Sequence, residues 1–345
     1  MLPLIPPIVR NLSMQRRRGS RRWIVAALAV ALAGCSGESG SAASGAYAAP
    51  RTPWGDPDLT GTWPIDKLNG TPVQRPESFG GRRFLTDEEF AERVERLRGL
   101  NARYDQEIAA NKMGNGHWAE IGQPNRLTSL IVEPANGRLP PLTAEGERRS
   151  VAMTSSWSDI SFDEVADFNA LDRCITRGMP ASMFPFMYNS GIEIVQAPGY
   201  VVIRLELVHA TRVVPLDGRP PLASEIVQWL GDSRGHFEGD TLVIETRNFN
   251  GETPMLVVGP GGRPIPTSRD MRIVERLTRT AADMIDYEIT VEDPEVLAEP
   301  WKAAFPLPRD DGYRMFEYAC HEGNYGMEGI LSGAREEERK AAAKK

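Results

Sequence analysis

Two strands and the turn between them stand out in residues 271–291, which read MRIVERLTRTAADMIDYEITV. Residue types common in strands dominate 271–280 and 284–291, and Ala281, Ala282 and Asp283 form a short break between them. A connection this short joins antiparallel strands, because a parallel crossover needs a dozen or more residues. We therefore expect an antiparallel hairpin here.

Further strands are expected on the N-terminal side of this hairpin. The predicted strands are 191–196, 200–215 and 241–246, and the predicted turns are 197–199, 216–218 and 238–240. Alternation places Ile203 and Leu205 on one face of the second strand, with Arg204 and Glu206 on the other. The pattern predicts a mainly β fold, either an antiparallel β-barrel or a sandwich.

An N-terminal helical segment is expected near 87–112. Thr86 and Glu89 have the spacing of a capping box, and apolar residues then recur at helical intervals. We expect a single β-rich domain over 53–334, followed by a charged, solvated tail at 335–345. The 27 prolines and 32 glycines of the 345 residues imply many turns and argue against a helical bundle.

The N-terminus has the features of an export signal. Six arginines precede an apolar run from Trp23 to Ala33, which is too short to span a bilayer. The run leads into Gly34-Cys35, and 32–35 resembles a bacterial lipobox, so we expect a signal peptide at 1–34 and lipidation of Cys35. Residues 35–52 would then form a lipidated, flexible tether. Ser36 offers no inner-membrane retention signal, so we expect the periplasmic side of the outer membrane.

The charge balance argues against nucleic acid as a partner. Removing a leader with six arginines would leave 34 basic against 47 acidic residues, a formal charge of −13. A polyanion needs a basic surface, which this composition does not supply. Membrane attachment would therefore come from the lipid on Cys35. Residues 20–24 resemble a twin-arginine signal, and both Sec and twin-arginine export remain open.

The three cysteines suggest one disulfide. Lipidation of Cys35 would leave Cys174 and Cys320 as a pair in an oxidising compartment, where disulfides persist. We expect the two to be bridged, and two separate buried thiols are the alternative. A bridge would bring Asp172 and Arg173 near His321 and Glu322.

The residues around this bridge are the first candidates for chemistry. An imidazole beside a carboxylate suits acid–base catalysis near neutral pH, so the catalytic candidates are His321, Glu322, His209 and Asp172. The candidate ligand-binding residues are Arg173, Arg212, Asn324 and Tyr325. His209 continues the Ile203 face by parity and would lie at a barrel mouth, unless a bulge reverses its direction or it is bonded in the core. A structural polar network around the bridge is the other interpretation.

Common cofactor and metal signatures are missing from the sequence. It contains no Walker A loop, dinucleotide fingerprint, HExxH, CxxC or G-x-S-x-G motif. Its four histidines lack metal-type spacing, so we predict no metal and no cofactor.

Several short motifs together resemble a widespread family of uncharacterised exported bacterial proteins. The motifs are PWGDPDL at 53–59, DRC at 172–174, GYVV at 199–202, His209 with Thr211-Arg212, PLDGR at 215–219, GDSRG at 231–235, EGDTL at 238–242 and EYACHEGNY at 317–325. The resemblance covers about 53–334 and implies export, but it supplies no catalytic residue. Residues 231–306 are also similar to calycin or lipocalin-like barrels, an analogy of fold alone.

These observations lead to one expected function and two alternatives. We expect an exported lipoprotein whose β-barrel domain binds a small organic ligand, hydrophobic or aromatic. The first alternative is a metal-independent acid–base enzyme, a lyase, hydratase, isomerase or hydrolase, that uses His321 or His209 with nearby carboxylates. The second is a structural envelope protein without a ligand.

Overall fold

The computed structural model describes residues 47–158, 160–257 and 263–344. The predicted signal peptide, Cys35 and most of the predicted tether lie outside these residues. The last part of that tether, 47–52, is packed on the domain: Ala49 and Thr52 are buried, and Arg51 forms an ion pair with Asp240. The ordered domain therefore begins before the predicted boundary at residue 53.

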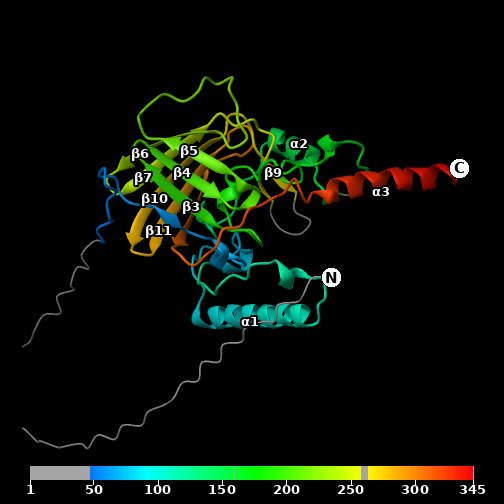
Figure 1. Cartoon of the computed structure of the whole chain (residues 1–345), viewed down its shortest axis with the longest axis horizontal. Coiled ribbons are helices and arrows are strands. Elements are labelled where there is room, and N and C mark those ends of the chain that lie inside the picture. The colour runs from blue at the N-terminus through cyan, green and yellow to red at the C-terminus, as the bar shows by residue number, and fades with distance from the viewer. Residues whose placement is uncertain (1–46, 159, 258–262, 345) are drawn as a thin grey trace, which may run out of the picture. The chain divides into compact units, whose positions relative to one another are not determined.

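A six-stranded antiparallel sheet contains the hairpin predicted from 271–291 (Figure 1). Its strands, in spatial order, are β2 (Ile131–Glu133), β12 (Trp301–Pro308), β11 (Met284–Glu292), β10 (Arg272–Ala281), β7 (Thr241–Arg247) and β6 (Asp232–Glu238). Buried and less buried residues alternate along β10, β11 and β12, as expected for a sheet with one face on the core. The predicted antiparallel hairpin is confirmed.

A second antiparallel sheet has four strands. Their order is β1 (Gly61–Thr62), β3 (Ile192–Ala197), β4 (Tyr200–Leu205) and β5 (Thr211–Pro215). The predicted continuous strand at 200–215 is wrong, because the backbone turns at Val208 and His209, whose φ angles are 57° and 41°. The alternation ends before this turn, because β4 stops at Leu205 and Glu206 has helical φ and ψ angles of −66° and −47°; Glu206 is buried instead of sharing the exposed side of Arg204.

Both sheets contribute to one hydrophobic core. Ile194 and Ile203 from the four-stranded sheet belong to the same buried cluster as Leu242, Ile273 and Leu307 from the six-stranded sheet. Within the described residues the sheets form no closed barrel, since the six-stranded ladder ends at β2 and β6 and the four-stranded one at β1 and β5. β8 (Pro254–Val257) and β9 (Pro264–Pro266) form a separate pair. Packed side chains thus occupy the space where a barrel lumen was expected.

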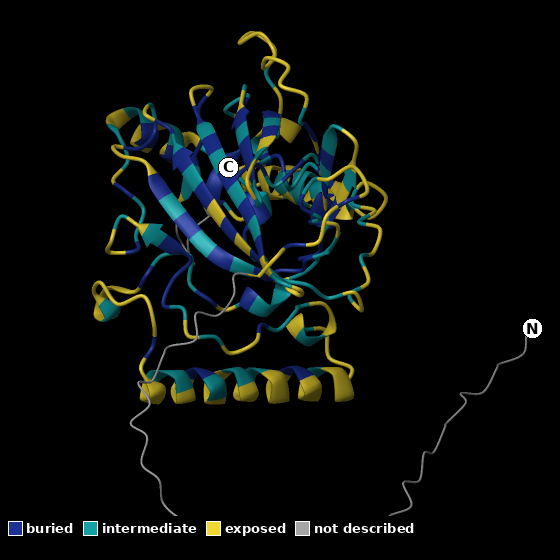
Figure 2. Cartoon of the chain, turned by 90° about the vertical axis from the view of Figure 1, so that its left-hand side faces the viewer, coloured by how far each residue is buried: buried dark blue, intermediate teal, exposed yellow. Residues whose placement is uncertain are grey.

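Helices make the described fold mixed α/β with antiparallel sheets, instead of mainly β. Its α-helices are α1 (Asp87–Ala109), α2 (Ala144–Ala152) and α3 (Tyr325–Ala342). The predicted capping box of Thr86 and Glu89 begins α1, whose outer face is exposed (Figure 2). α3 includes most of the predicted charged tail, where near neighbours such as Arg335 and Glu338 pair along the helix surface.

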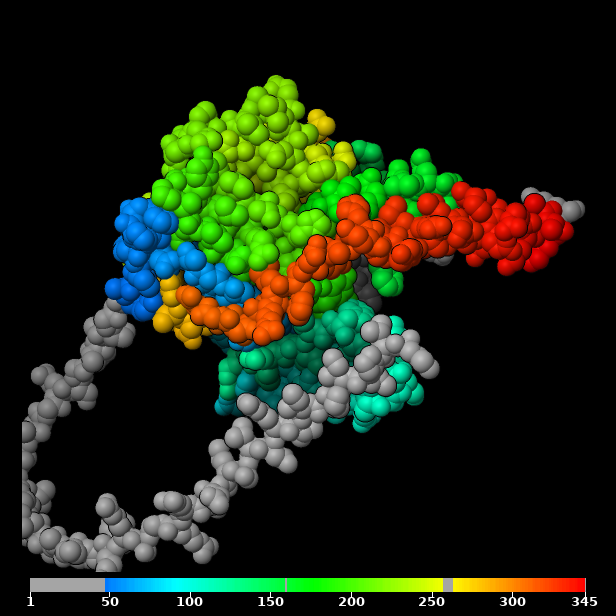
Figure 3. Space-filling view, viewed as in Figure 1, coloured from blue at the N-terminus to red at the C-terminus, as the bar shows by residue number. Residues whose placement is uncertain are grey.

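A segment without regular structure joins β12 to α3. We call residues 309–324 the C-terminal strap; they run across the surface of the domain (Figure 3). The predicted disulfide is present: Cys320 of the strap is bonded to Cys174, with their Cα atoms 5.6 Å apart. This bond fixes one end of the strap to a distant part of the chain.

Candidate functional site

The residues next to the disulfide secure the strap. The Asp172 carboxylate accepts hydrogen bonds from the backbone and hydroxyl of Ser156, at 2.8 and 2.7 Å, and from the backbone of Asn169. Asn324 donates its amide to the Asp172 carbonyl oxygen at 2.8 Å. Both predicted site residues, Asp172 and Asn324, therefore have local structural partners.

The other predicted residues of this region lie at the surface. His321 and Glu322 are exposed, and Tyr325 is 76% exposed. The Arg173 guanidinium is 5.9 Å from the ring centroid of Trp229, and its buried Nε has no hydrogen-bond partner among the described residues. The disulfide brings these sequence positions together, but it does not enclose them in one cavity.

His209 contacts the strap from the turn between β4 and β5. Its Nδ1 lies 3.0 Å from the carbonyl oxygen of Tyr318. A carbonyl oxygen only accepts hydrogen bonds, so Nδ1 carries the proton and donates it. The left-handed turn thus directs this exposed histidine to the strap and away from the barrel mouth where we expected it.

Arg212 is buried in the core and paired with Glu275 of β10. Its Nη1 donates to Oε1 of Glu275 at 2.9 Å, its Nη2 donates to Oε2, and Tyr287 donates its hydroxyl to Oε1 at 2.9 Å. Burial opposes the charge of Arg212, yet the facing carboxylate raises the pKa of the guanidinium above its ordinary value. This arginine has its own counter-ion, so it does not present a free charge to an anionic ligand.

A pocket of about 510 Å³ opens beside the strap, and we call it the strap pocket. None of the catalytic or ligand-binding residues predicted from the sequence lines it. Its lining residues come from 117–120, 188–189, Glu206 and the strap itself, and they are His117, Trp118, Glu120, Tyr188, Asn189, Glu206, Gly312, Tyr313, Arg314 and Phe316. The pocket therefore gathers two carboxylates, a phenol and several aromatic rings.

Glu206 is the buried carboxylate of the strap pocket, and it is fully hydrogen-bonded. Its Oε1 accepts from the Asn189 amide at 3.0 Å and from the Phe316 backbone at 2.8 Å. Its Oε2 accepts from the Gly191 backbone at 3.2 Å and from the Tyr313 hydroxyl at 2.8 Å. Both oxygens of Glu206 are therefore occupied by donors of the protein.

Gly191 lies close to this carboxylate. A Cβ atom at position 191 would lie 2.7 Å from Oε2 of Glu206 and 2.8 Å from the Tyr313 ring. Glycine thus allows the backbone to approach the carboxylate.

Glu120 is the more accessible carboxylate of the pair. Its Oε1 lies 2.9 Å from the Tyr313 hydroxyl, and its Oε2 accepts from the Ser190 backbone at 3.2 Å. Burial raises the pKa of Glu120, and the nearby Asp66 carboxylate raises it further, against the hydrogen bonds from Ser190 and Tyr313. The side chain is half-buried and lines the pocket.

Tyr313 links the two carboxylates with a single proton. Burial and the neighbouring Glu206 and Glu120 raise the pKa of its hydroxyl strongly, so it stays protonated. One phenolic proton serves one carboxylate at a time. When Tyr313 donates to Glu206, its oxygen can accept from Glu120 only if Glu120 carries a proton itself. The three groups therefore form a short hydrogen-bonded chain that ends at the pocket with Glu120.

Aromatic rings form the wall of the pocket. Trp118 and Tyr188 meet edge to face with their centroids 5.3 Å apart, and Tyr188 stacks on Tyr318 at 6.3 Å. Trp118 is 45% exposed and Phe316 69% exposed, so both offer ring surface to a bound molecule. Large exposed aromatic surfaces beside a polar group are typical of small-molecule sites.

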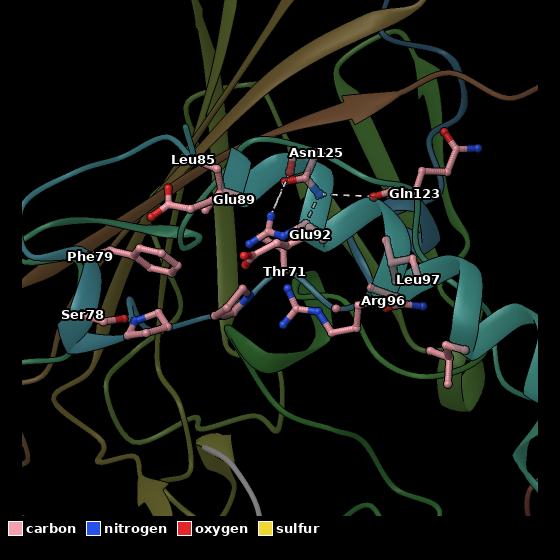
Figure 4. Close-up of a pocket in the computed structure, with 16 residues that line it drawn as sticks. Thr71, Ser78, Phe79, Leu85, Glu89, Glu92, Arg96, Leu97, Gln123 and Asn125 are labelled. Carbon is pink, nitrogen blue, oxygen red and sulfur yellow. Dashed lines mark hydrogen bonds between the residues drawn. The ribbon is translucent and has the colours of Figure 1, made fainter. Parts of the chain in front are cut away.

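A second pocket, of about 530 Å³, lies against α1 (Figure 4). Arg93 is buried there and donates to the carbonyl oxygens of Asn125 and Leu127 at 2.9 and 2.7 Å. Asn125 donates to the Thr71 hydroxyl at 2.7 Å. These hydrogen bonds connect α1 to residues 125–127 and these in turn to Thr71, so Arg93 and Asn125 act in the fold.

Sequence reasoning missed Glu120 and Tyr313. They are 193 positions apart and both lie outside regular secondary structure, so no periodicity connects them. Tyr313 precedes the EYACHEGNY motif by a few residues, and its position on a chain segment fixed by a disulfide was the available signal.

Comparisons with protein-family models, curated proteins and solved structures find no match. In the described part of the chain, no three His, Cys, Asp or Glu side chains are grouped so that they could hold a metal ion. No helix among those residues is long and apolar enough to cross a bilayer.

Proposed function

We propose that this protein binds a small organic molecule with an aromatic ring in the strap pocket. The supporting observation is the combination of exposed ring surface on Trp118 and Phe316 with the half-buried carboxylate of Glu120 in one pocket of about 510 Å³. A volume of this size suits a small ligand. The rings would supply apolar contact area, and Glu120 would fix the orientation of a polar group.

The scaffold suits such a role, since it is fixed on both sides of the pocket. We regard the two sheets that share one core as the layers of a β-sandwich, similar to the predicted calycin-like fold without its closed barrel. The disulfide and the His209 hydrogen bond hold the strap on this sandwich. A preorganised wall loses little conformational entropy when a ligand binds.

We propose further that the protein is exported and anchored by a lipid on Cys35, as the resemblance to exported bacterial proteins implies. The Cys174–Cys320 disulfide fits this location, because such bonds persist in oxidising compartments. Replacing Cys35 with serine should release the protein from the membrane fraction of an expressing cell. Retention of the Cys35→Ser protein in that fraction would contradict a lipid anchor.

Acid–base catalysis is the second candidate, with Glu120 in place of the predicted histidines. The observation that favours it is the chain from Glu120 through Tyr313 to Glu206, which can pass a proton to or from a molecule in the pocket. Turnover of a bound compound that stops in the Glu120→Gln variant, with binding retained, would support catalysis. Unchanged turnover in this variant would exclude this mechanism.

The binding proposal is tested with a panel of small aromatic compounds and ligand-observed NMR. Compounds that bind the wild type should lose binding in Trp118→Ala. Trp157 is 94% exposed and is not among the lining residues, so Trp157→Ala is the matched control and should bind normally. Equal binding to the wild type and to both variants would overturn the assignment of the pocket.

A further inference from the structure

We infer that the preferred ligand of the strap pocket is an organic cation, an amine that carries both an aromatic or alkyl group and a positive charge. The inference rests on the proposed function, because it specifies the charge of the molecule that the pocket binds. The observations that carry it are the carboxylate pair at the polar end and the aromatic wall beside it.

The charge of the lining is the first argument. Glu120 and Glu206 both lie within hydrogen-bond distance of the Tyr313 hydroxyl, and its single proton can serve only one of these two acidic groups at a time. Glu206 already has four hydrogen-bond donors, whereas Glu120 accepts from the Ser190 backbone and the shared Tyr313 hydroxyl. A ligand ammonium beside Glu120 would supply both the missing donors and the missing opposite charge.

The neighbouring charged groups leave this balance negative. Asp66 raises the pKa of Glu120 through its own negative charge, and Lys67 lies 3.7 Å from Asp310, which offsets its charge. The cationic group of the lining is Arg314, an exposed residue of the strap. His117 also lines the pocket, and its Nε2 lies 2.8 Å from the Lys112 carbonyl oxygen, to which it donates. The lining thus contains two acidic side chains and one guanidinium, a composition that favours a cationic over an anionic ligand.

The aromatic wall is the second argument. Ring faces attract cations, and tryptophan and tyrosine do so most strongly. This cluster already binds a cation of the protein: the Arg177 guanidinium lies 4.5 Å from the centroid of Phe186, which packs on Tyr188 at 4.9 Å. On the other side of Tyr188, the half-exposed ring of Trp118 is available to a cation from solution.

The test uses three compounds of nearly the same size, benzylamine, benzyl alcohol and benzoate, which carry charges of about +1, 0 and −1 at neutral pH. Isothermal titration calorimetry on the disulfide-bonded domain should show benzylamine binding at least about tenfold more tightly than benzyl alcohol, and benzoate binding most weakly. The Glu120→Gln variant should bind the amine and the alcohol with affinities that differ by less than about threefold. The exposed carboxylate of Glu288 on β11 provides the control, and Glu288→Gln should keep the preference for the amine.

The possible outcomes separate this inference from the proposed function. Equal or tighter binding of benzyl alcohol, or a preference for the amine that survives Glu120→Gln, would overturn the cation assignment while the pocket remains a binding site. If none of the three compounds binds, and no compound of the aromatic panel loses binding in Trp118→Ala, both the cation assignment and the proposed binding function are overturned. If the preference for benzylamine is lost in Glu120→Gln and kept in Glu288→Gln, the result supports both the cation assignment and the proposed binding function.

Discussion

Two clusters in this protein join a tyrosine to glutamate, and they differ in what surrounds them. In the core cluster, Tyr287 donates to Glu275, whose charge is balanced by Arg212, and Glu275 is fully buried. In the strap pocket, Tyr313 lies between Glu206 and Glu120, and no arginine or lysine of the described ranges forms a salt bridge with either carboxylate. The core cluster therefore joins a guanidinium to a carboxyl group in a buried place, whereas the pocket cluster joins two carboxyl groups and is open on the side of Glu120.

This difference shows why residue type alone does not identify a site. A buried charge is tolerated when its partners are built into the fold, and it then serves the fold. The carboxylate of Glu120 is held at a pocket and has no salt-bridge partner in the part of the chain that the structure describes, so a ligand could supply the opposite charge. Substitutions in the core cluster should therefore affect folding stability, and substitutions in the pocket cluster should also affect ligand binding.

The largest effect on stability is expected from Arg212→Met. This change leaves Glu275 buried without its counter-ion, and we expect a loss of about 3–5 kcal/mol in the free energy of unfolding, measured by urea denaturation. The double variant Arg212→Met with Glu275→Leu should recover most of the loss, because it removes both charges. A single variant that loses less than about 1 kcal/mol would mean that the core cluster is not a closed ion pair.

Breaking the disulfide should affect both stability and the pocket. The bond closes a separation of 146 residues, so Cys174→Ser with Cys320→Ser should cost about 2–4 kcal/mol of unfolding free energy. The strap carries Tyr313, and we therefore expect ligand affinity to fall together with hydrogen-exchange protection of 309–324. Full affinity in the double variant would show that the strap is positioned without the bond.

The sequence allowed prediction of the features whose signals are local or can be counted. The hairpin at 271–291 follows from strand propensity around a short turn, the start of α1 from the capping box at Thr86, and the disulfide from the number of cysteines. Each depends on neighbouring residues or on the only pair that lipidation of Cys35 would leave.

The parts that could not be predicted depend on backbone conformation and distant pairing. Parity along 200–215 assumed an unbroken strand, but the helical backbone at Glu206 and the left-handed turn at Val208 and His209 end the alternation. Arg212 was expected to hold a ligand, but its partner Glu275 comes from the other sheet, and no sequence pattern links β5 to β10. The lining of the strap pocket likewise comes from segments far apart in the sequence.

Removing either tyrosine hydroxyl compares the two clusters directly. Tyr287→Phe and Tyr313→Phe each delete one hydrogen bond to a glutamate that keeps other donors, so each should lower the unfolding free energy by about 1 kcal/mol. Only Tyr313→Phe should also change the affinity for benzylamine and its dependence on pH. Equal effects of both variants on binding would contradict a special role for the pocket cluster.

The smallest effect on stability concerns the titration of Glu120. Burial raises its pKa above the ordinary value of 4.5, so the folded protein holds this proton more tightly than the unfolded chain does. The stabilisation from the protonated group is complete below pH 4.5 and is lost as the pH rises through the folded-state pKa. Glu120→Gln resembles the protonated form, so the variant should gain stability relative to the wild type across this window. The gain should be small, because Glu120 is partly solvated.

Ligand affinity should change with pH in the same window, and its sign distinguishes a cation from other ligands. Protonation removes the charge that would attract an ammonium group, so benzylamine should bind the wild type more weakly as the pH falls through the pKa of Glu120. Benzyl alcohol should show no such loss, and Glu120→Gln should bind benzylamine weakly at every pH. The core cluster should not contribute to this pH dependence of ligand affinity, because Arg212 stays charged and stays paired with Glu275. If the affinity for benzylamine rises on acidification instead, the cation assignment is wrong. Such a result would mean that the bound state requires the protonated form of Glu120, which cannot pair with an ammonium group.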